Sequence, residues 1–188
     1  MSSGLQTARL LLLPSDPRLA PSVACYFSRN WAFLRPFEPV REDVFFTAAG
    51  QRRLLKQERR DRAAGGCYRF WLYKKEKRGP VIGSVALSGL VRGSFQSALV
   101  SYRLDEALQG RGYATEAVER LMDFAFGTLG LHRLEASIMP RNKPSLRVVE
   151  KLGFVNEGLS RAYLNINGVW EDHIRFAKIN EGYGLVEN

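Results

Sequence analysis

The sequence contains few of the residues that disulfide-rich and metal-binding proteins need. Among 188 residues there are 2 cysteines, Cys25 and Cys67, and 2 histidines, His132 and His173. Two thiols so far apart form neither a disulfide framework nor a metal-ligand spacing, and neither histidine lies in a ligand motif. We therefore expect reduced thiols, no metal site and a cytoplasmic protein.

Long apolar runs are also missing. The longest one near the N-terminus, Leu10 to Leu13, is flanked by Arg9 and Arg18. It is far shorter than the ~20 residues that cross a bilayer. The sequence therefore predicts no signal peptide, no transmembrane helix and no membrane partner.

Positive charge is in excess. There are 28 Lys and Arg residues against 19 Asp and Glu, which gives a net charge of +9, and 21 of the cations are Arg. The planar fork of Arg suits phosphate and carboxylate recognition, so the excess indicates an anionic partner. It does not choose among nucleic acid, a phosphorylated cofactor, an acidic protein and a membrane surface. Length and ordinary globular composition favour one domain over residues 1–188.

The apolar pattern predicts an α/β fold. Strands are expected over residues 5–13, 68–75, 81–87, 97–104 and 132–139. Helices are expected over residues 18–30, 41–62 and 112–129, and from the N-cap Asn142 to the helix stop Gly153. Two prolines predict an extended aromatic loop over residues 30–39. Residues 76–80 are expected to form a hairpin turn, and Asn167-Gly168 is expected to form the turn of a final hairpin. Together these elements give a mixed, mostly antiparallel sheet of six to seven strands flanked by about four helices.

One stretch carries the clearest chemistry. A strand ends near Leu104, a loop with Gly110 and Gly112 follows, and an amphipathic helix begins. Backbone N–H groups of such a loop and first helical turn lack partners within the helix and lie at the positive end of its dipole, so they bind an anion such as a pyrophosphate. Neither the Rossmann glycine spacing nor the Walker Gly-Lys-Ser/Thr is present.

Gln109-Gly110-Arg111-Gly112-Tyr113-Ala114 resembles the Q/R-x-x-G-x-G/A signature of the GNAT family of N-acetyltransferases. Asn142, Ser145 and Glu150-Lys151-Leu152-Gly153-Phe154 resemble the N-x-x-S and E-K-L-G-F block of the RimJ/RimL branch, which modifies the N-termini of ribosomal proteins. Similarity at residues 31–43, 90–95 and 163–173, typical of the ribosomal-protein-alanine N-acetyltransferases, extends the resemblance over nearly the whole chain. The resemblance implies the GNAT fold, with acetyl-CoA as the cosubstrate.

The same resemblance implies a set of cofactor-binding residues. They are Tyr102, Arg103 and Leu104 beside the pantetheine arm, Gln109, Gly110, Arg111, Gly112, Tyr113, Ala114 and Thr115 at the pyrophosphate, and Asn142 and Lys151 on the following helix. A plain helix N-cap explains Asn142 equally well, and an exposed helix face explains Lys151 nearly as well.

Ser145 matches the hydroxyl that the family places near the thioester sulfur, where it assists the departing thiolate. A first-turn serine bonded to its own backbone is the alternative. The general base is a departure from the family pattern, because residues 98–101 and Ala162 hold no carboxylate where relatives do. Glu135 is our first choice and Asp172 the second, while a buried structural hydrogen bond explains Glu135 equally well. An α-amine, with a pKa of ~8, needs little help from a base.

Acceptor selection is expected from an aromatic segment and a few residues elsewhere. These are Trp31, Phe33, Arg35, Phe37, Glu38, Arg92, Tyr163 and Trp170. Core packing is an even alternative for Phe37 and Trp170.

The leading hypothesis is therefore acetyl transfer from acetyl-CoA to the N-terminal amine of a protein, a ribosomal protein beginning with Ala or Ser. The ribosome is a possible partner, the protein is a monomer or homodimer, and no specific nucleic acid is expected. Two alternatives stay open: acetylation of a small-molecule amine such as an antibiotic or metabolite, and a non-catalytic module that binds the ribosome or RNA.

Overall fold

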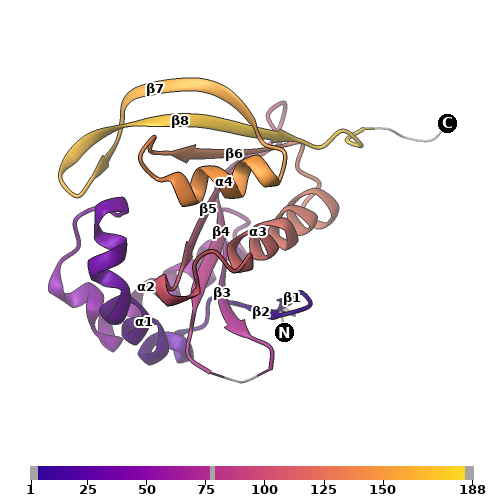
Figure 1. Ribbon diagram of the computed structural model, residues 1–188. Helices are drawn as coiled ribbons and strands as arrows, with labels where there is room; N and C mark the ends of the chain where they lie inside the picture. The colour runs from indigo at the N-terminus through magenta and orange to yellow at the C-terminus, as the bar shows by residue number, and fades with distance from the viewer. Residues whose placement is uncertain (1–3, 77–78, 185–188) are drawn as a thin grey trace.

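The computed structural model describes residues 4–76 and 79–184. An eight-stranded sheet lies at its centre, with strand order β1-β2-β3-β4-β5-β6-β8-β7 (Figure 1). The strands are β1 (Leu5–Gln6), β2 (Leu10–Pro14), β3 (Tyr68–Lys74), β4 (Gly83–Val91), β5 (Ser97–Leu104), β6 (Arg133–Ile138), β7 (Val155–Ile166) and β8 (Val169–Ile179). Only β5 and β6 pair in parallel. This confirms the predicted fold class, and the count exceeds the prediction because residues 5–13 divide into two strands at a turn.

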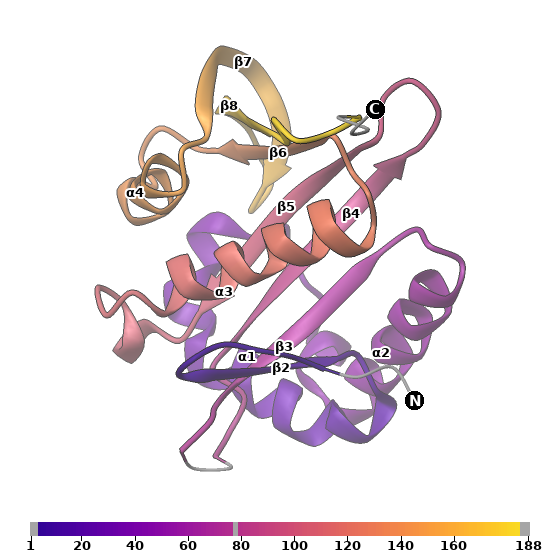
Figure 2. The same ribbon diagram turned by 90° about the vertical axis from the view of Figure 1, so that its right-hand side faces the viewer.

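Helices cover both faces of this sheet. Helices α3 (Tyr113–Asp123) and α4 (Lys143–Lys151) pack on the face that holds the larger core, and α3 runs along β4 and β5 (Figure 2). Helices α1 (Ala20–Leu34) and α2 (Ala48–Ala63) pack around Trp71 on the other face. The shorter helical turns are η1 (Pro17–Leu19), η2 (Arg35–Phe37), η3 (Asp43–Phe46), η4 (Glu106–Leu108) and the π turn η5 (Phe124–Thr128).

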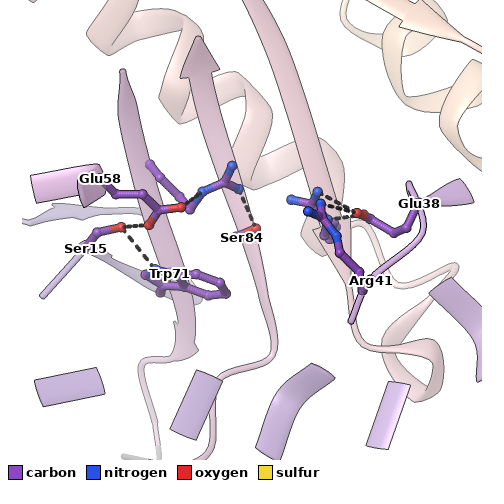
Figure 3. A network of polar contacts seen from close by, with 8 residues as sticks. Ser15, Glu38, Arg41, Glu58, Trp71 and Ser84 are labelled. Carbon is purple, nitrogen blue, oxygen red and sulfur yellow. Dashed lines mark hydrogen bonds and ion pairs between the residues drawn. The ribbon is translucent and has the colours of Figure 1, made fainter. Parts of the chain in front are cut away.

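A buried polar network ties α2 to the sheet. Glu58 on α2 accepts hydrogen bonds from the Ser15 hydroxyl at 2.6 Å and from Arg69 Nε at 2.7 Å. The Trp71 indole also donates to the Ser15 hydroxyl, at 3.1 Å (Figure 3). Because each buried polar group has a partner, the network fixes the position of α2 at little cost in desolvation.

Sequence signals at the ends of several elements match the structure. The Asn142 side chain accepts from the Ser145 N–H at 3.3 Å and caps α4, and Gly153, with a φ of 71°, follows two residues after the helix ends at Lys151. At the tip of the β7–β8 hairpin, Asn167 and Gly168 have φ angles of 48° and 87°, as a type I′ turn requires. Helix α2 begins later than predicted, because the Thr47 hydroxyl caps it by accepting from the Gly50 N–H at 3.0 Å.

The segment from Asn30 to Pro39 differs from the prediction. Residues 30–34 continue α1, and Arg35–Phe37 form a 3-10 turn instead of an extended loop. Pro36 lies in the first turn of that short helix, where its missing N–H costs no hydrogen bond. The buried Asn30 side chain donates to the Tyr26 carbonyl at 3.0 Å and accepts from the Glu106 N–H at 3.1 Å, which stabilises the longer helix. Of the predicted hairpin turn over 76–80, residues 77–78 lie outside the described residues.

The feature that positions the site is the divergence of β5 and β6. The two strands pair only from Ser97 opposite Arg133 to Leu99 opposite Glu135. Beyond Leu99, β5 continues against β4 while β6 pairs with β8. The sheet therefore opens between the last five residues of β5 and the end of β6.

Candidate active site

A cleft of about 790 Å³ occupies the opening between β5 and β6. One wall is β5 from Val100 to Leu104, and the opposite wall is β6 from Ala136 to Ile138. Val100 to Leu104 pair with β4 along one edge only. Across the described residues, no strand pairs with their other edge, so its backbone groups face the cleft and remain available to a ligand.

The predicted anion-binding loop forms one end of the cleft. Gln109, Gly110 and residues 112–115 line it, where α3 begins. Gly110 and Gly112 have φ angles of 71° and 79°, a conformation that favours glycine. Arg9, directly before β2, braces the loop, donating to the Arg111 carbonyl at 2.9 Å and pairing with Glu116 at 2.6 Å. The loop is therefore held open with its N–H groups at the positive end of α3.

Helix α4 adds positive charge beside this end. Arg147 and Lys151 line the cleft, both are exposed, and neither forms an ion pair with any other described residue. A ligand phosphate would supply the missing partner. The glycine loop, a helix N-terminus and two free cations fit a phosphorylated cosubstrate.

Ser145 lies at the first turn of α4, half-buried in the cleft wall. Tyr102 on β5 donates its hydroxyl to the Ser145 carbonyl at 2.9 Å, which joins β5 to α4 across the cleft. Burial raises the pKa of Tyr102 to about 12, so its hydroxyl keeps its proton and remains a donor at neutral pH.

The other end of the cleft is mostly apolar. Phe33 and Phe37 line it together with Leu164 and Ile166 of β7. One carboxylate lies among them: Glu38 is only 5% exposed and pairs with the Arg103 guanidinium through two hydrogen bonds. Burial opposes its ionisation, yet Arg103 and then Arg41 hold the pKa of Glu38 below its usual range. Glu38 and Arg41 point toward each other in Figure 3.

The tip of the β7–β8 hairpin contacts this apolar end. The Asn167 N–H donates to the Glu38 carbonyl at 2.9 Å, and Arg35 Nε donates to the Asn167 side chain at 3.3 Å. Arg141 joins the same elements, pairing with Glu171 at 2.6 Å and donating to the Pro36 carbonyl at 3.2 Å. Figure 1 shows the hairpin arching over α4 and descending to the α1 region. The apolar end of the cleft is thus bounded by segments far apart in the chain.

The structure brings most of the predicted residues to the cleft. Of the cofactor set, all but Arg111 line it, and of the acceptor set Phe33, Phe37 and Glu38 do. Arg111 lies at the edge, where its backbone carbonyl holds Arg9. Arg35 lines a smaller neighbouring pocket, on the outer side of the hairpin contact.

Four other acceptor residues lie elsewhere. Trp31 packs against Phe46 in the α1–α2 core, with ring centroids 4.9 Å apart. Arg92 bonds to the Leu129 carbonyl at 2.8 Å, near the opposite end of β5. Tyr163 packs against His173 without lining the cleft itself, and Trp170 is 64% exposed, which rules out core packing for it.

Glu135, the first choice for the base, does not line the cleft. Arg133 donates to it at 2.8 Å, and Arg175 from β8 also donates to it. Burial disfavours its charge, but these two arginines hold the pKa of Glu135 below its ordinary value. The carboxylate is therefore a structural ion-pair partner in this arrangement, which matches the alternative reading of Glu135.

Sequence reasoning missed several lining residues, above all His173 on β8. Most of the other omissions are apolar, including Leu34, Pro39, Met139, Val148, Leu164 and Ile166. Their periodicity marks them as core, and only the divergence of β5 and β6 exposes them to the cleft. For His173, a signal was present: a polar residue at an inward position of the last strand.

Comparison with known proteins agrees with the geometry. The model of the acetyltransferase (GNAT) domain matches residues 9–155. A probable N-acetyltransferase of Bacillus subtilis, YjcK, is 41% identical over 153 residues, which are 81% of this chain and 84% of that protein.

Two solved structures share the fold over almost the whole chain. The ribosomal-protein-S5-alanine acetyltransferase of Vibrio fischeri is 35% identical, with a TM-score of 0.91 over 97% of this chain and 99% of that one. RimJ of Mycobacterium smegmatis, solved with CoA-disulfide, is 27% identical, with a TM-score of 0.87 over 93% and 84% of the two chains. Within the described ranges, no helix has the length and apolar character needed to cross a bilayer.

Proposed function

The chain belongs to the GNAT family of N-acetyltransferases, and from that premise we propose that it acetylates the N-terminal α-amine of a protein, with a ribosomal protein beginning with Ala or Ser as its substrate. The observation that carries this proposal is the cleft itself, which has a glycine loop beside two cations at one end and a mostly apolar surface with one carboxylate at the other. Similarity over nearly full length to an S5-alanine acetyltransferase supports the choice of acceptor.

The residues of the cationic end fit acetyl-CoA. The N–H groups of residues 110–115 would hold the pyrophosphate, and Arg147 and Lys151 would meet the phosphate charges. The free edge of β5 from Val100 to Leu104 would hydrogen-bond the amides of the pantetheine arm. The cosubstrate supplies an activated acyl group, and its thiolate is a good leaving group because the ordinary thiol pKa is ~8.5.

Ser145 is our candidate for the residue that assists that departure. Its backbone is fixed twice, by Asn142 at its N–H and by Tyr102 at its carbonyl, so its hydroxyl has a defined place in the cleft wall. We assign to the Ser145 hydroxyl the donation of a proton to the departing sulfur. The backbone N–H groups of the free β5 edge would polarise the thioester oxygen.

The apolar end would receive the acceptor. Phe33 and Phe37 would pack on the small first side chain of the peptide, and the Glu38 carboxylate would favour the positive amino terminus before it loses its proton. The smaller pocket that Arg35 lines, beside the hairpin tip, would leave room for the following residues of the acceptor peptide. The apolar end would accommodate the small first side chain of a peptide better than the long side chain of a lysine. This favours an N-terminal amine as the acceptor.

The test measures free thiol released from acetyl-CoA with a panel of amines. Peptides beginning with Ala or Ser are compared with the same peptides blocked at the N-terminus and carrying one internal lysine. We expect turnover only with the free N-termini. Turnover with small amines and none with any peptide would overturn the assignment and favour the small-molecule alternative.

The ribosomal assignment needs a separate measurement. Intact masses of ribosomal proteins are compared between cells with and without this chain. We expect one species to lose the mass of a single acetyl group when the chain is absent. Peptide turnover without any such change would retain protein N-terminal acetylation and reject the ribosomal substrate.

A further inference from the structure

His173 is a buried histidine in the cleft wall that the reaction described above does not use. It lies on β8, next to Ile174, which pairs with Ile138 at the end of β6. The residue is 3% exposed, yet it lines the cleft together with β5 and β6. A nearly buried imidazole at this place has a defined orientation, and the part of it that remains accessible faces the cleft.

One hydrogen bond defines its protonation. His173 Nδ1 lies 2.9 Å from the backbone carbonyl oxygen of Glu171. A carbonyl can only accept, so Nδ1 must carry the hydrogen. In the neutral ring, Nε2 then bears a lone pair, and no group among the described residues donates to it. The imidazole is therefore held as an acceptor at Nε2, in the tautomer that a general base needs.

The acidic groups near the cleft are already engaged. Glu38, the only carboxylate that lines it in the described part of the chain, accepts from Arg103 and Arg41. Glu171 pairs with Arg141, and the Asp172 carboxylate accepts from the Ala162 N–H at 2.8 Å. The arginine partners stabilise the ionised forms of Glu38 and Glu171, which makes both weaker bases, and neither Glu171 nor Asp172 is among the described residues that line the cleft.

The other groups that face His173 are aromatic or paired. The Tyr163 ring packs edge-on against it, with centroids 5.8 Å apart, and Arg175 lies over the Tyr163 ring, 5.0 Å from its centroid. Arg175 in turn is bound to Glu135. Among the described residues, no cation therefore contacts the imidazole directly.

Resting on the proposed function, we infer that His173 is the general base of the transfer, accepting the amine proton at Nε2. The neutral amine attacks the thioester carbonyl and the N–C bond forms. The C–S bond breaks, the N–H proton passes to His173, and the thiolate takes a proton from Ser145. Ser145 regains its proton from the protonated His173, directly or through water, which restores both residues.

Two substitutions separate the roles of the two ring nitrogens. In His173→Asn the amide N–H can still donate to the Glu171 carbonyl, but the group at Nε2 is lost. We expect kcat to fall about 10²- to 10⁴-fold, the usual contribution of a general base, with the Kd for acetyl-CoA unchanged. In His173→Ala, added imidazole should restore part of the lost rate. His132→Asn, at the other histidine, is the control and should keep wild-type kcat.

A second readout does not depend on knowing the acceptor. Nitrogen-15 NMR of histidine-labelled protein reports which ring nitrogen carries the hydrogen, and His132→Asn assigns the two signals. We expect the neutral form of His173 to carry its hydrogen at Nδ1, which leaves Nε2 as an acceptor. A neutral form with its hydrogen at Nε2, or wild-type kcat in His173→Asn with any amine that the protein acetylates, would overturn the inference. Activity on small amines alone would instead reject the peptide acceptor and leave His173 as the base.

Discussion

Glu38 is the charged residue whose burial most affects both stability and the site. Its carboxylate is held by Arg103 of β5, and its backbone carbonyl accepts from Asn167 at the hairpin tip. One residue thus connects the segment after α1, the cleft wall and the last hairpin. These contacts hold Glu38, which lies outside the helices and strands, at the apolar end of the cleft.

Removing this carboxylate charge should destabilise the protein. In Glu38→Gln the Arg103 guanidinium stays largely buried without a counter-charge, and breaking a buried pair from one side costs about 3 kcal/mol or more. Urea denaturation measures the loss of unfolding free energy. Asp123→Asn, in an exposed pair with Arg120, is the control and should lose less than about 1 kcal/mol. Equal losses in the two variants would contradict the buried pair.

Acid should weaken the fold through the same residue. The folded-state pKa of Glu38 is lowered by Arg103, so its contribution is complete above the unfolded pKa of ~4.3 and disappears as the pH falls through the folded value. The pKa of Glu116 is lowered by the Thr7 hydroxyl and then Arg9, and that of Glu135 by Arg133 and Arg175, so both residues act in the same direction. We therefore expect unfolding free energy to decline below about pH 5, and less steeply in Glu38→Gln. Parallel declines in the two proteins would show that Glu38 takes no part.

At the scale of elements, the loop before α3 depends on two glycines in different surroundings. Both have positive φ angles, but a Cβ at Gly112 would lie 3.3 Å from Arg9 Nη2, whereas one at Gly110 would meet nothing within 4 Å. Ala at either position costs about 1–2 kcal/mol of backbone strain. Gly112→Ala should also displace Arg9, which braces the loop, so we expect a larger rise in the Kd for acetyl-CoA than in Gly110→Ala. Calorimetric titration measures both values, and equal affinities would show that Arg9 does not shape the loop.

The same scale shows what local sequence could predict. The strand over 97–104, the cap at Asn142 and the Asn167-Gly168 turn follow from chemistry within a few residues, and the structure has all three. The 30–39 segment could not be predicted that way, because the side chain of Asn30 is held by the backbone of Glu106, far along the chain. Pro36 and Pro39 each favour an extended backbone for the residue before them, and this tertiary contact overrides that local preference.

The candidate site was predictable in part for a related reason. The glycine loop and Ser145 belong to continuous motifs, so resemblance reached them directly. Which residues of β6 meet the cleft depends on where β6 leaves β5, a property of the whole sheet. Alternation correctly placed Glu135 and Ser137 on one side of β6, but only Ser137 lies beyond the last paired residue and lines the cleft.

For the whole molecule, the net charge of +9 is distributed over sites with different surroundings. Several arginines are neutralised within the fold, including Arg9, Arg103 and Arg133. Arg147 and Lys151 remain unpaired at the cleft, and Arg52 and Arg53 remain exposed on α2. Total charge therefore does not indicate where an anion binds, whereas the position of unpaired cations beside a glycine loop does.

This difference can be tested with two variants of equal charge. Arg147→Ala with Lys151→Ala removes two cations at the cleft, and Arg52→Ala with Arg53→Ala removes two on α2. If phosphates of acetyl-CoA bind beside α4, the first variant should raise its Kd about tenfold, a loss of ~1.4 kcal/mol, and reduce the dependence of Kd on salt. The α2 variant should keep wild-type affinity, because charges beyond a Debye length of about 10 Å are largely screened at 0.1 M salt. Equal weakening in both variants would mean that acetyl-CoA responds to the overall charge, and the cationic end of the cleft would lose its assignment.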